Sequence, residues 1–148
     1  RSRGVYVLEK TVDIAAVCTA GGISALTAAD IIQAIDVPAE SYIIHAGVEV
    51  LTALNGTTPT LDVDFAAGDD FVDGFDATGT GYAGAGTNGH VDYTAVTTFS
   101  NRITATDTID IKVNAGANDV STGKIRVYAI LADISGLDET DSLQAVTF

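Results

Sequence analysis

Short runs of alternating apolar and polar residues recur along this sequence and limit what it can fold into. The clearest run is "KIRVYAILADI". One side of it carries Ile125, Val127, Ala129 and Leu131. Arg126 and Tyr128 fall on the opposite side. A period of two residues is that of a β-strand with one inner and one outer face, so this segment predicts a strand.

Two further runs alternate in the same way. In "DTIDIKVNA" the inward residues are Ile109, Ile111 and Val113. In "TLDVDFA" the inward residues are Leu61, Val63 and Phe65. Asp62 and Asp64 fall on the other side, so we expect them on a solvent-exposed face. The β-branched segments "SYIIHAGVEVLTAL" and "VDYTAVTTFS" also predict extended structure.

The segment "LTAADIIQAIDVPAES" has two interpretations. Thr27 followed by Asp30 fits the start of a short helix. Alternatively "DIIQAIDV" is a strand that stops at Pro38, which has no N–H to donate to a ladder, and we favour the strand. Near the N-terminus, "GVYVLEKTVDIAAV" predicts a strand or extended arm, and "TAGGIS" predicts a connector.

A Gly- and Asp-rich excursion, "AGDDFVDGFDATGTGYAGAGTNGH", interrupts the strands. We expect a long loop held to the body by Phe71, Phe75 and Tyr82. Short strands joined by turns and one long loop predict an all-β fold, an antiparallel β-sandwich that is jelly-roll-like, with an extended N-terminal arm. The expected divisions are an arm, first strand and linker (1–20), a sandwich body (21–135) and a C-terminal tail (136–148).

Charge excludes several classes of partner. The formal net charge is −13, and no basic side chain lies between Lys10 and Arg102. Such a chain repels phosphate backbones, so we expect neither nucleic-acid binding nor attachment to anionic membranes. No run of eighteen apolar residues exists that would predict a membrane span.

The acidic loop is the one candidate cation site. Asp69, Asp70, Asp73 and Asp76 offer oxygen ligands of the kind that calcium takes. However, "DDFVDG" departs from the EF-hand pattern at Phe71, and no Glu closes the loop. A solvated acidic surface is the favoured interpretation, and no cofactor is expected.

No other residue predicts catalysis. His45 lies in an expected strand and His90 follows a Gly-rich loop, so each is expected to be a structural histidine with a hydrogen-bond partner. Cys18 lies among small apolar residues, which predicts a buried, inert thiol. No enzymatic activity is expected.

Three successive motifs carry a resemblance to a known family. They are "ADIIQAIDVPAESYIIHAGVEVLTA", "TLDVDFAAGDDFVDGFDATGTG" and "TIDIKVNAGANDVSTGKIRVYAILADI". Over residues 27–134 the chain resembles capsid decoration (cement) proteins and related virion β-sandwiches of tailed phages, especially those of marine and cyanobacterial hosts. The acidic loop matches the acidic loop of that family, which has no catalytic residues to carry over.

The resemblance implies a virion protein on the outer surface of the capsid. Its expected partners are the major capsid protein and further copies of itself, as a trimer or dimer. The basic N-terminal segment is the expected attachment arm: Arg1, Arg3 and Lys10 would pair with capsid carboxylates. Tyr6 and Leu8 would fill pockets on a neighbouring strand edge. Deletion of residues 1–10 is therefore expected to weaken attachment and to leave the fold intact.

Two alternatives remain open. The first is a tail, fibre or neck structural component, or a host-attachment component, of the virion. The second is a calcium- or carbohydrate-binding adhesion module, disfavoured because the sequence has no Trp and predicts few clustered aromatics for sugar stacking.

Overall fold

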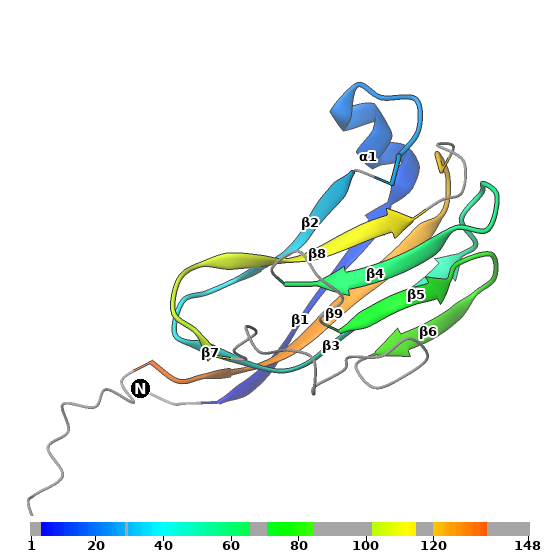
Figure 1. Ribbon diagram of the computed structural model, residues 1–148. Coiled ribbons are helices and arrows are strands. Elements are labelled where there is room, and N and C mark those ends of the chain that lie inside the picture. The colour runs from blue at the N-terminus through cyan, green and yellow to red at the C-terminus, as the bar shows by residue number, and fades with distance from the viewer. Residues whose placement is uncertain (1–3, 29, 66–70, 85–101, 115–119, 136–148) are drawn as a thin grey trace, which may run out of the picture.

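The chain folds as two antiparallel sheets packed face to face, with one helix at the end of the sandwich (Figure 1). This computed structural model describes residues 4–28, 30–65, 71–84, 102–114 and 120–135. The five-stranded sheet has the order β1-β9-β3-β6, with β7 also paired to β3, and the four-stranded sheet has the order β2-β8-β4-β5. The bounds are β1 Val5–Asp13, α1 Ile14–Gly21, β2 Ile31–Val37, β3 Ser41–Thr52, β4 Thr60–Asp64, β5 Val72–Asp76, β6 Gly81–Gly84, β7 Arg102–Ile103, β8 Asp107–Asn114 and β9 Lys124–Asp133.

The strand pairing is nested. With the short β7 set aside, the first strand pairs with the last, β2 with β8, β3 with β6 and β4 with β5, all antiparallel. Apart from β4 and β5, which pair as a hairpin, this nesting places consecutive strands in opposite sheets, as in jelly-roll-like sandwiches. The expected all-β sandwich is confirmed.

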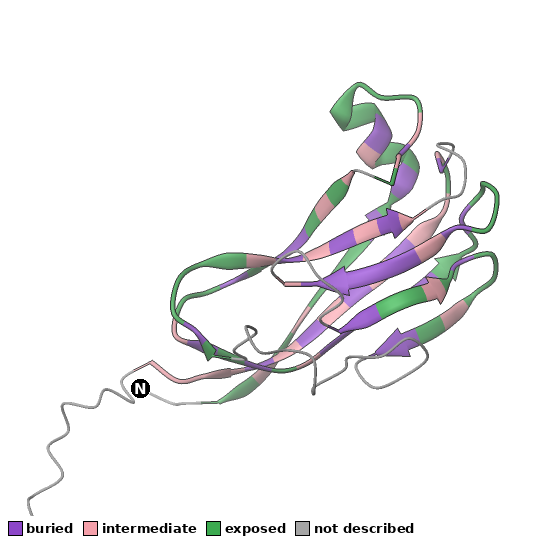
Figure 2. Ribbon diagram, viewed as in Figure 1, coloured by how far each residue is buried: buried purple, intermediate pink, exposed green. Residues whose placement is uncertain are grey.

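The core lies between the sheets and consists almost entirely of aliphatic side chains. Strand β9 alternates as expected, and its inward residues are fully buried: Ile125, Val127, Ala129 and Leu131. Strand β8 contributes Ile109, Ile111 and Val113 in the same way. Full burial of one such side chain contributes about 1.5–3 kcal/mol, so these two central strands anchor the sheets to each other (Figure 2).

Residues 31–37 form strand β2, as favoured from the sequence. The helix α1, Ile14–Gly21, replaces the end of the expected strand at 14–17 and the start of the expected connector at 19–21. The side chain of Asp13 accepts hydrogen bonds from the backbone N–H groups of Ala15 and Ala16, which caps the helix start. Gly22 ends it in the left-handed conformation at a φ of 66°.

The N-terminal segment belongs to the sandwich. Residues Val5–Asp13 pair with β9 along their whole length, from Val5 opposite Ala132 to Asp13 opposite Lys124. The expectation that deleting residues 1–10 leaves the fold intact is therefore wrong. Such a deletion would remove six of the nine paired residues of β1. The proposed division into arm, body and tail stays a prediction.

The acidic excursion contains regular structure. Residues 72–76 form β5 and residues 81–84 form β6, where a loop is expected from the sequence. Phe71 is buried and Phe75 packs against the core, as expected. Tyr82 is 53% exposed, so it does not hold this segment to the core.

Asp62 and Asp64 are buried, although alternation places them on a solvent-exposed face. The carboxylate of Asp62 accepts a hydrogen bond from the backbone N–H of Gly74 at 2.9 Å and another from the side-chain amide of Asn114. The β4–β5 ladder shifts register between Leu61 and Val63. The irregular β5 turns a backbone N–H toward Asp62, and this contact keeps the carboxylate buried.

Several expectations concern residues outside the described ranges, including the strand at 91–100 and the tail at 136–148. Within the described ranges, no helix has the length and apolar character needed to cross a membrane.

Candidate functional site

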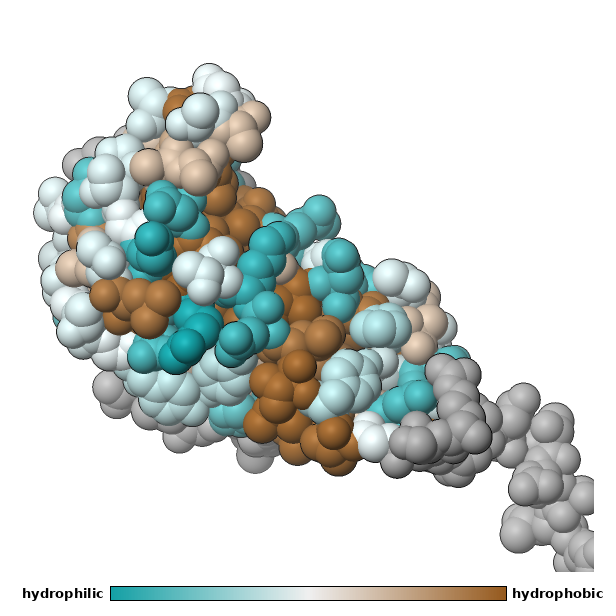
Figure 3. All heavy atoms as spheres, turned by 180° about the vertical axis from the view of Figure 1, so that it is seen from behind, coloured by the Kyte–Doolittle hydropathy of each residue, from teal (hydrophilic) through white to brown (hydrophobic). Residues whose placement is uncertain are grey.

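The outer side of the five-stranded sheet gathers exposed apolar and aromatic side chains. Of the eight large hydrophobic residues exposed in the described part of the chain, six lie on strands of this sheet: Val5, Val7, Tyr42, Ile44, Leu51 and Tyr82. Figure 3 views the molecule from behind Figure 1 and shows an apolar area across this side, next to polar side chains. Apolar surface that gathers on one side marks an interaction site more often than scattered residues do.

Strand register brings three rings together on this outer side. Tyr128 on β9 lies opposite Gly47 of β3, which in turn lies opposite Gly84 of β6. The hydroxyl of Tyr128 donates to the hydroxyl of Tyr82 at 2.6 Å and lies 3.1 Å from Nε2 of His45. The Tyr82 and Tyr128 rings are stacked, with centroids 5.9 Å apart. We call Tyr82, Tyr128 and His45 the aromatic cluster.

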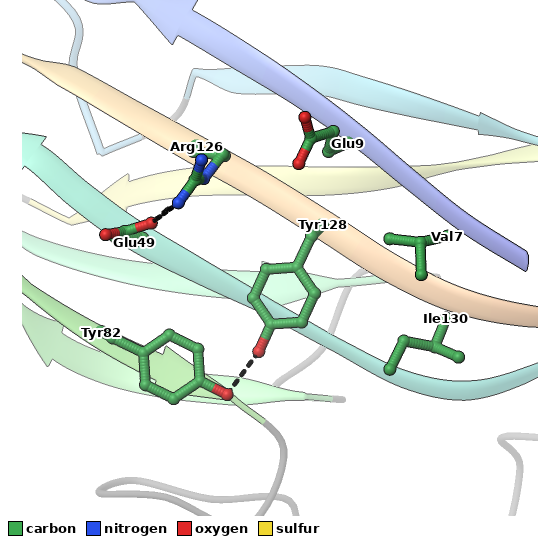
Figure 4. Close-up of a pocket in the computed structure, with 7 residues that line it drawn as sticks. All are labelled: Val7, Glu9, Glu49, Tyr82, Arg126, Tyr128 and Ile130. Carbon is green, nitrogen blue, oxygen red and sulfur yellow. Dashed lines mark hydrogen bonds and ion pairs between the residues drawn. The ribbon is translucent and has the colours of Figure 1, made fainter.

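Two glycines make the aromatic cluster possible. A Cβ atom on Gly47 would lie 2.4 Å from the Tyr128 hydroxyl and 2.5 Å from the backbone oxygen of Ala83. A Cβ atom on Gly84 would lie 2.6 Å from His45 Nε2 and 2.7 Å from the same hydroxyl. Because neither glycine carries a side chain, Tyr128 extends from β9 across β3 toward Tyr82 (Figure 4).

The environment of the aromatic cluster keeps Tyr128 and His45 uncharged at neutral pH. Burial, with the hydrogen bond to Tyr82 and the proximity of that group, raises the pKa of Tyr128 well above its ordinary value. Its hydroxyl therefore stays protonated at physiological pH. Burial lowers the pKa of His45, so the imidazole is neutral at pH 7. Tyr128 and His45 therefore present neutral hydrogen-bonding groups.

An open hollow of about 450 Å³ lies beside the aromatic cluster, lined by Val7, Glu9, Glu49, Tyr82, Arg126, Tyr128 and Ile130 (Figure 4). Arg126 lies opposite Glu49 in the β3–β9 register and forms a two-nitrogen contact with its carboxylate, with Nε to Oε2 at 3.0 Å. This pairing cancels both charges where they face solvent.

Charge is divided unequally between the two sheets. The strands of the five-stranded sheet carry four acidic and four basic side chains, a net charge of zero. The strands of the four-stranded sheet carry seven acidic side chains and one basic side chain, a net charge of −6. We call the outward surface of the five-stranded sheet (β1, β9, β3, β6 and β7) the neutral face and that of β2, β8, β4 and β5 the acidic face.

The residues expected to bind a partner fall into three groups. Arg1 and Arg3 lie outside the described ranges. Lys10 is exposed on β1. Tyr6 and Leu8 are partly buried and pack against the core cluster, so they hold β1 to its own sandwich. Their role in binding a partner stays a prediction.

The acidic loop is only partly described. Asp69 and Asp70 lie outside the described ranges, whereas Asp73 and Asp76 are exposed on β5. A hydrogen bond from the backbone N–H of Thr78 lowers the pKa of Asp76. The described residues contain no group of three or more His, Cys, Asp or Glu side chains arranged to hold a metal ion. The cation site therefore stays a prediction.

His45 has the expected hydrogen-bond partner, Tyr128, whereas His90 lies outside the described ranges. Cys18 is buried in α1, with its Sγ 4.0 Å from the backbone oxygen of Val120. A thiol this deeply buried is inaccessible to a substrate.

Two solved structures share this fold. A chain of the cyanophage Pam1 capsid asymmetric unit matches with a TM-score of 0.54 and 18% sequence identity, over 88% of this chain and 85% of the other. A chain of the acidic stable capsid structure of Helicobacter pylori bacteriophage KHP30 matches with a TM-score of 0.50 and 10% identity, over 88% and 89%. This fold occurs in phage capsids. No protein-family model matches the sequence, and no curated protein matches it.

The neutral face is the feature that sequence reasoning does not identify. Alternation places Val7 and Tyr128 on outward sides of their own strands. It gives no indication that β1 and β9 are neighbours, or that β6 brings Tyr82 to within hydrogen-bonding distance of Tyr128. The expectation of few clustered aromatics is wrong for this reason. The only local signal is Gly47 within a β-branched strand, where a glycine indicates close approach by another group.

Proposed function

We propose that this chain is a phage capsid decoration (cement) protein, which binds the outer surface of the head shell and stabilises it without enzymatic activity. The observation that carries the proposal is the likeness of its fold to two phage capsid chains over 85–89% of their lengths. The motif resemblance over residues 27–134 supports the same assignment independently of the structure.

The distribution of charge fits attachment to a shell. A decoration protein needs one surface that faces solvent and another that faces protein. The acidic face suits the solvent side, since its strands carry seven acidic side chains and only Asp62 and Asp64 of these are buried. Many copies on a regular lattice stabilise the shell through avidity, even when each contact is weak.

Attachment is assigned to charged groups at the N-terminal end of the chain. Arg1, Arg3 and Lys10 are proposed to pair with carboxylates of the major capsid protein. Tyr6 and Leu8, which pack against the core of their own sandwich, are available to a neighbour only if β1 leaves β9. A fair test of the attachment model therefore changes Arg1 and Arg3 to alanine and leaves β1 complete.

The copy number in purified virions tests the proposal. A decoration protein is expected in hundreds of copies per particle, in a fixed ratio to the major capsid protein, because it follows the capsid lattice. A tail, fibre or neck component would be present in a few tens of copies. Quantitative gel densitometry of purified particles measures this ratio. A count of a few tens would replace the decoration role with the tail role, and absence from the particle would refute both.

A further inference from the structure

The neutral face differs from the rest of the described surface in two independent respects. It holds six of the eight exposed large hydrophobic side chains, with Val5 and Val7 exposed to 65% and 60%. Its strands also carry no net charge, whereas the whole chain carries −13. An exposed apolar surface without net charge, on a strongly acidic protein, is suited to contact with another protein surface.

Charge also restricts which surfaces could form an interface between two copies of this chain. A net charge of −13 on each copy opposes contact between most pairs of surfaces. Contact between two neutral faces adds no like-charge repulsion at the interface and leaves the two acidic faces on opposite, outer sides. The exposed ion pairs support this arrangement. Arg126 is paired with Glu49, and Lys124 with Asp13 at 3.7 Å, so neither cation needs a partner from outside.

The size of the neutral face is adequate for a stable contact. A nine-residue strand such as β1 is about 30 Å long, and four adjacent strands span about 19 Å. The flat area of these four strands is therefore about 570 Å², and the projecting side chains add further contact surface. This is comparable with the surface of about 800 Å² per partner that a standard interface buries.

We propose that a second copy of this chain binds the neutral face, so that two sandwiches associate through their five-stranded sheets as a symmetric dimer. A two-fold axis would place the same surface on both sides of the interface. The exposed valines Val5 and Val7 would then pack against the aromatic and aliphatic side chains of the other copy. This inference concerns the isolated chain and does not depend on the proposed capsid role.

Two matched variants of the full 148-residue chain test the inference. Val7→Glu introduces a carboxylate on the neutral face, at a side chain that is 60% exposed. Ile31→Glu makes the same kind of change on β2 of the other sheet, at a side chain that is 55% exposed. Both positions face solvent in the single chain, so both variants should fold, which circular dichroism and thermal melting would verify.

Sedimentation equilibrium over a wide range of protein concentration gives the association state. We expect a monomer–dimer equilibrium for the unaltered chain and for Ile31→Glu. For Val7→Glu we expect a dissociation constant about a hundredfold higher, because two new carboxylates face a desolvated surface. Added salt should strengthen association of the unaltered chain, since it screens the net repulsion but removes no attraction between charges.

Four results would overturn the inference. They are a monomer at every concentration, a trimer, equal weakening by both variants, and no weakening by Val7→Glu. If the unaltered chain is monomeric but binds capsid shells in a Val7-dependent manner, the neutral face belongs to a capsid subunit and not to a second copy. The virion copy number is measured separately, so failure of the dimer and failure of the capsid role remain distinguishable.

Discussion

At the scale of single residues, Gly47 and Gly84 determine the character of the neutral face. Both are buried in the five-stranded sheet, and neither has a left-handed backbone. Their requirement for glycine therefore comes from space. The Tyr128 hydroxyl occupies the position that a side chain would take, and from there it reaches both Tyr82 and His45.

Substitution of Gly47 by alanine tests this explanation. The new methyl group would meet two backbone atoms, the Ala83 oxygen at 2.5 Å and the Gly84 Cα at 2.8 Å, as well as the Tyr128 hydroxyl. The first two contacts cannot be relieved by a side-chain rotation. We expect a loss of about 1–3 kcal/mol in the free energy of unfolding, measured by urea denaturation.

The control is Gly79→Ala, because a Cβ atom on Gly79 meets nothing within 4 Å. This variant should be as stable as the unaltered chain. Equal stability of Gly47→Ala and Gly79→Ala would contradict the close-approach explanation.

At the scale of elements, the two sheets use their acidic residues differently. On the five-stranded sheet, Glu49 and Asp13 are paired with basic residues across neighbouring strands. On the four-stranded sheet, Asp62 is held by hydrogen bonds from Gly74 and Asn114. Asp110 accepts from the Thr108 hydroxyl at 2.7 Å. Burial and repulsion from Asp107 raise the pKa of Asp110, although the Thr108 hydrogen bond opposes them.

This shift predicts how pH changes stability. A carboxyl with a higher pKa in the folded chain binds its proton more tightly there, so its charged form disfavours folding at neutral pH. Asp110→Asn removes that charge and keeps an acceptor for Thr108. We expect a higher free energy of unfolding at pH 7, with the gain disappearing as pH falls below the ordinary value of 3.8.

Asp76→Asn is the control with the opposite sign. The hydrogen bond from Thr78 lowers the pKa of Asp76, so its charged form favours folding above the unfolded-state pKa and the benefit is lost as pH falls. Its substitution should decrease stability at pH 7. Urea denaturation at both pH values measures the two effects, and a loss of stability in Asp110→Asn at pH 7 would refute the prediction.

Strands with a regular alternation of apolar and polar residues could be predicted from the sequence, and irregular ones could not. Alternation correctly assigned the inner faces of β8 and β9, because a single buried face imposes a period of two. Alternation wrongly predicted that Asp62 is exposed. The pattern of β4 does not show that Gly74 of β5 donates a hydrogen bond to this side chain. The predicted strand was also continued too far, into residues 14–17, which begin the helix. There, Asp13 as N-cap and the pair Gly21 and Gly22 at the other end are local helix signals.

At the scale of the whole molecule, topology converts a charge pattern along the chain into a charge difference between surfaces. The basic residues lie near the two ends of the sequence, with none between Lys10 and Arg102. The nested pairing joins β1 to β9 and so brings those ends into one sheet. The acidic middle of the chain supplies most of the other sheet. Since this depends on long-range strand pairing, the sequence predicted the net charge but not its division.

The most direct test of the capsid role is image reconstruction of the phage particle with and without this chain. We expect additional density outside the shell, repeated over the capsid lattice. Density confined to the tail or to one vertex, density inside the shell, or no difference between the two particles would contradict this expectation.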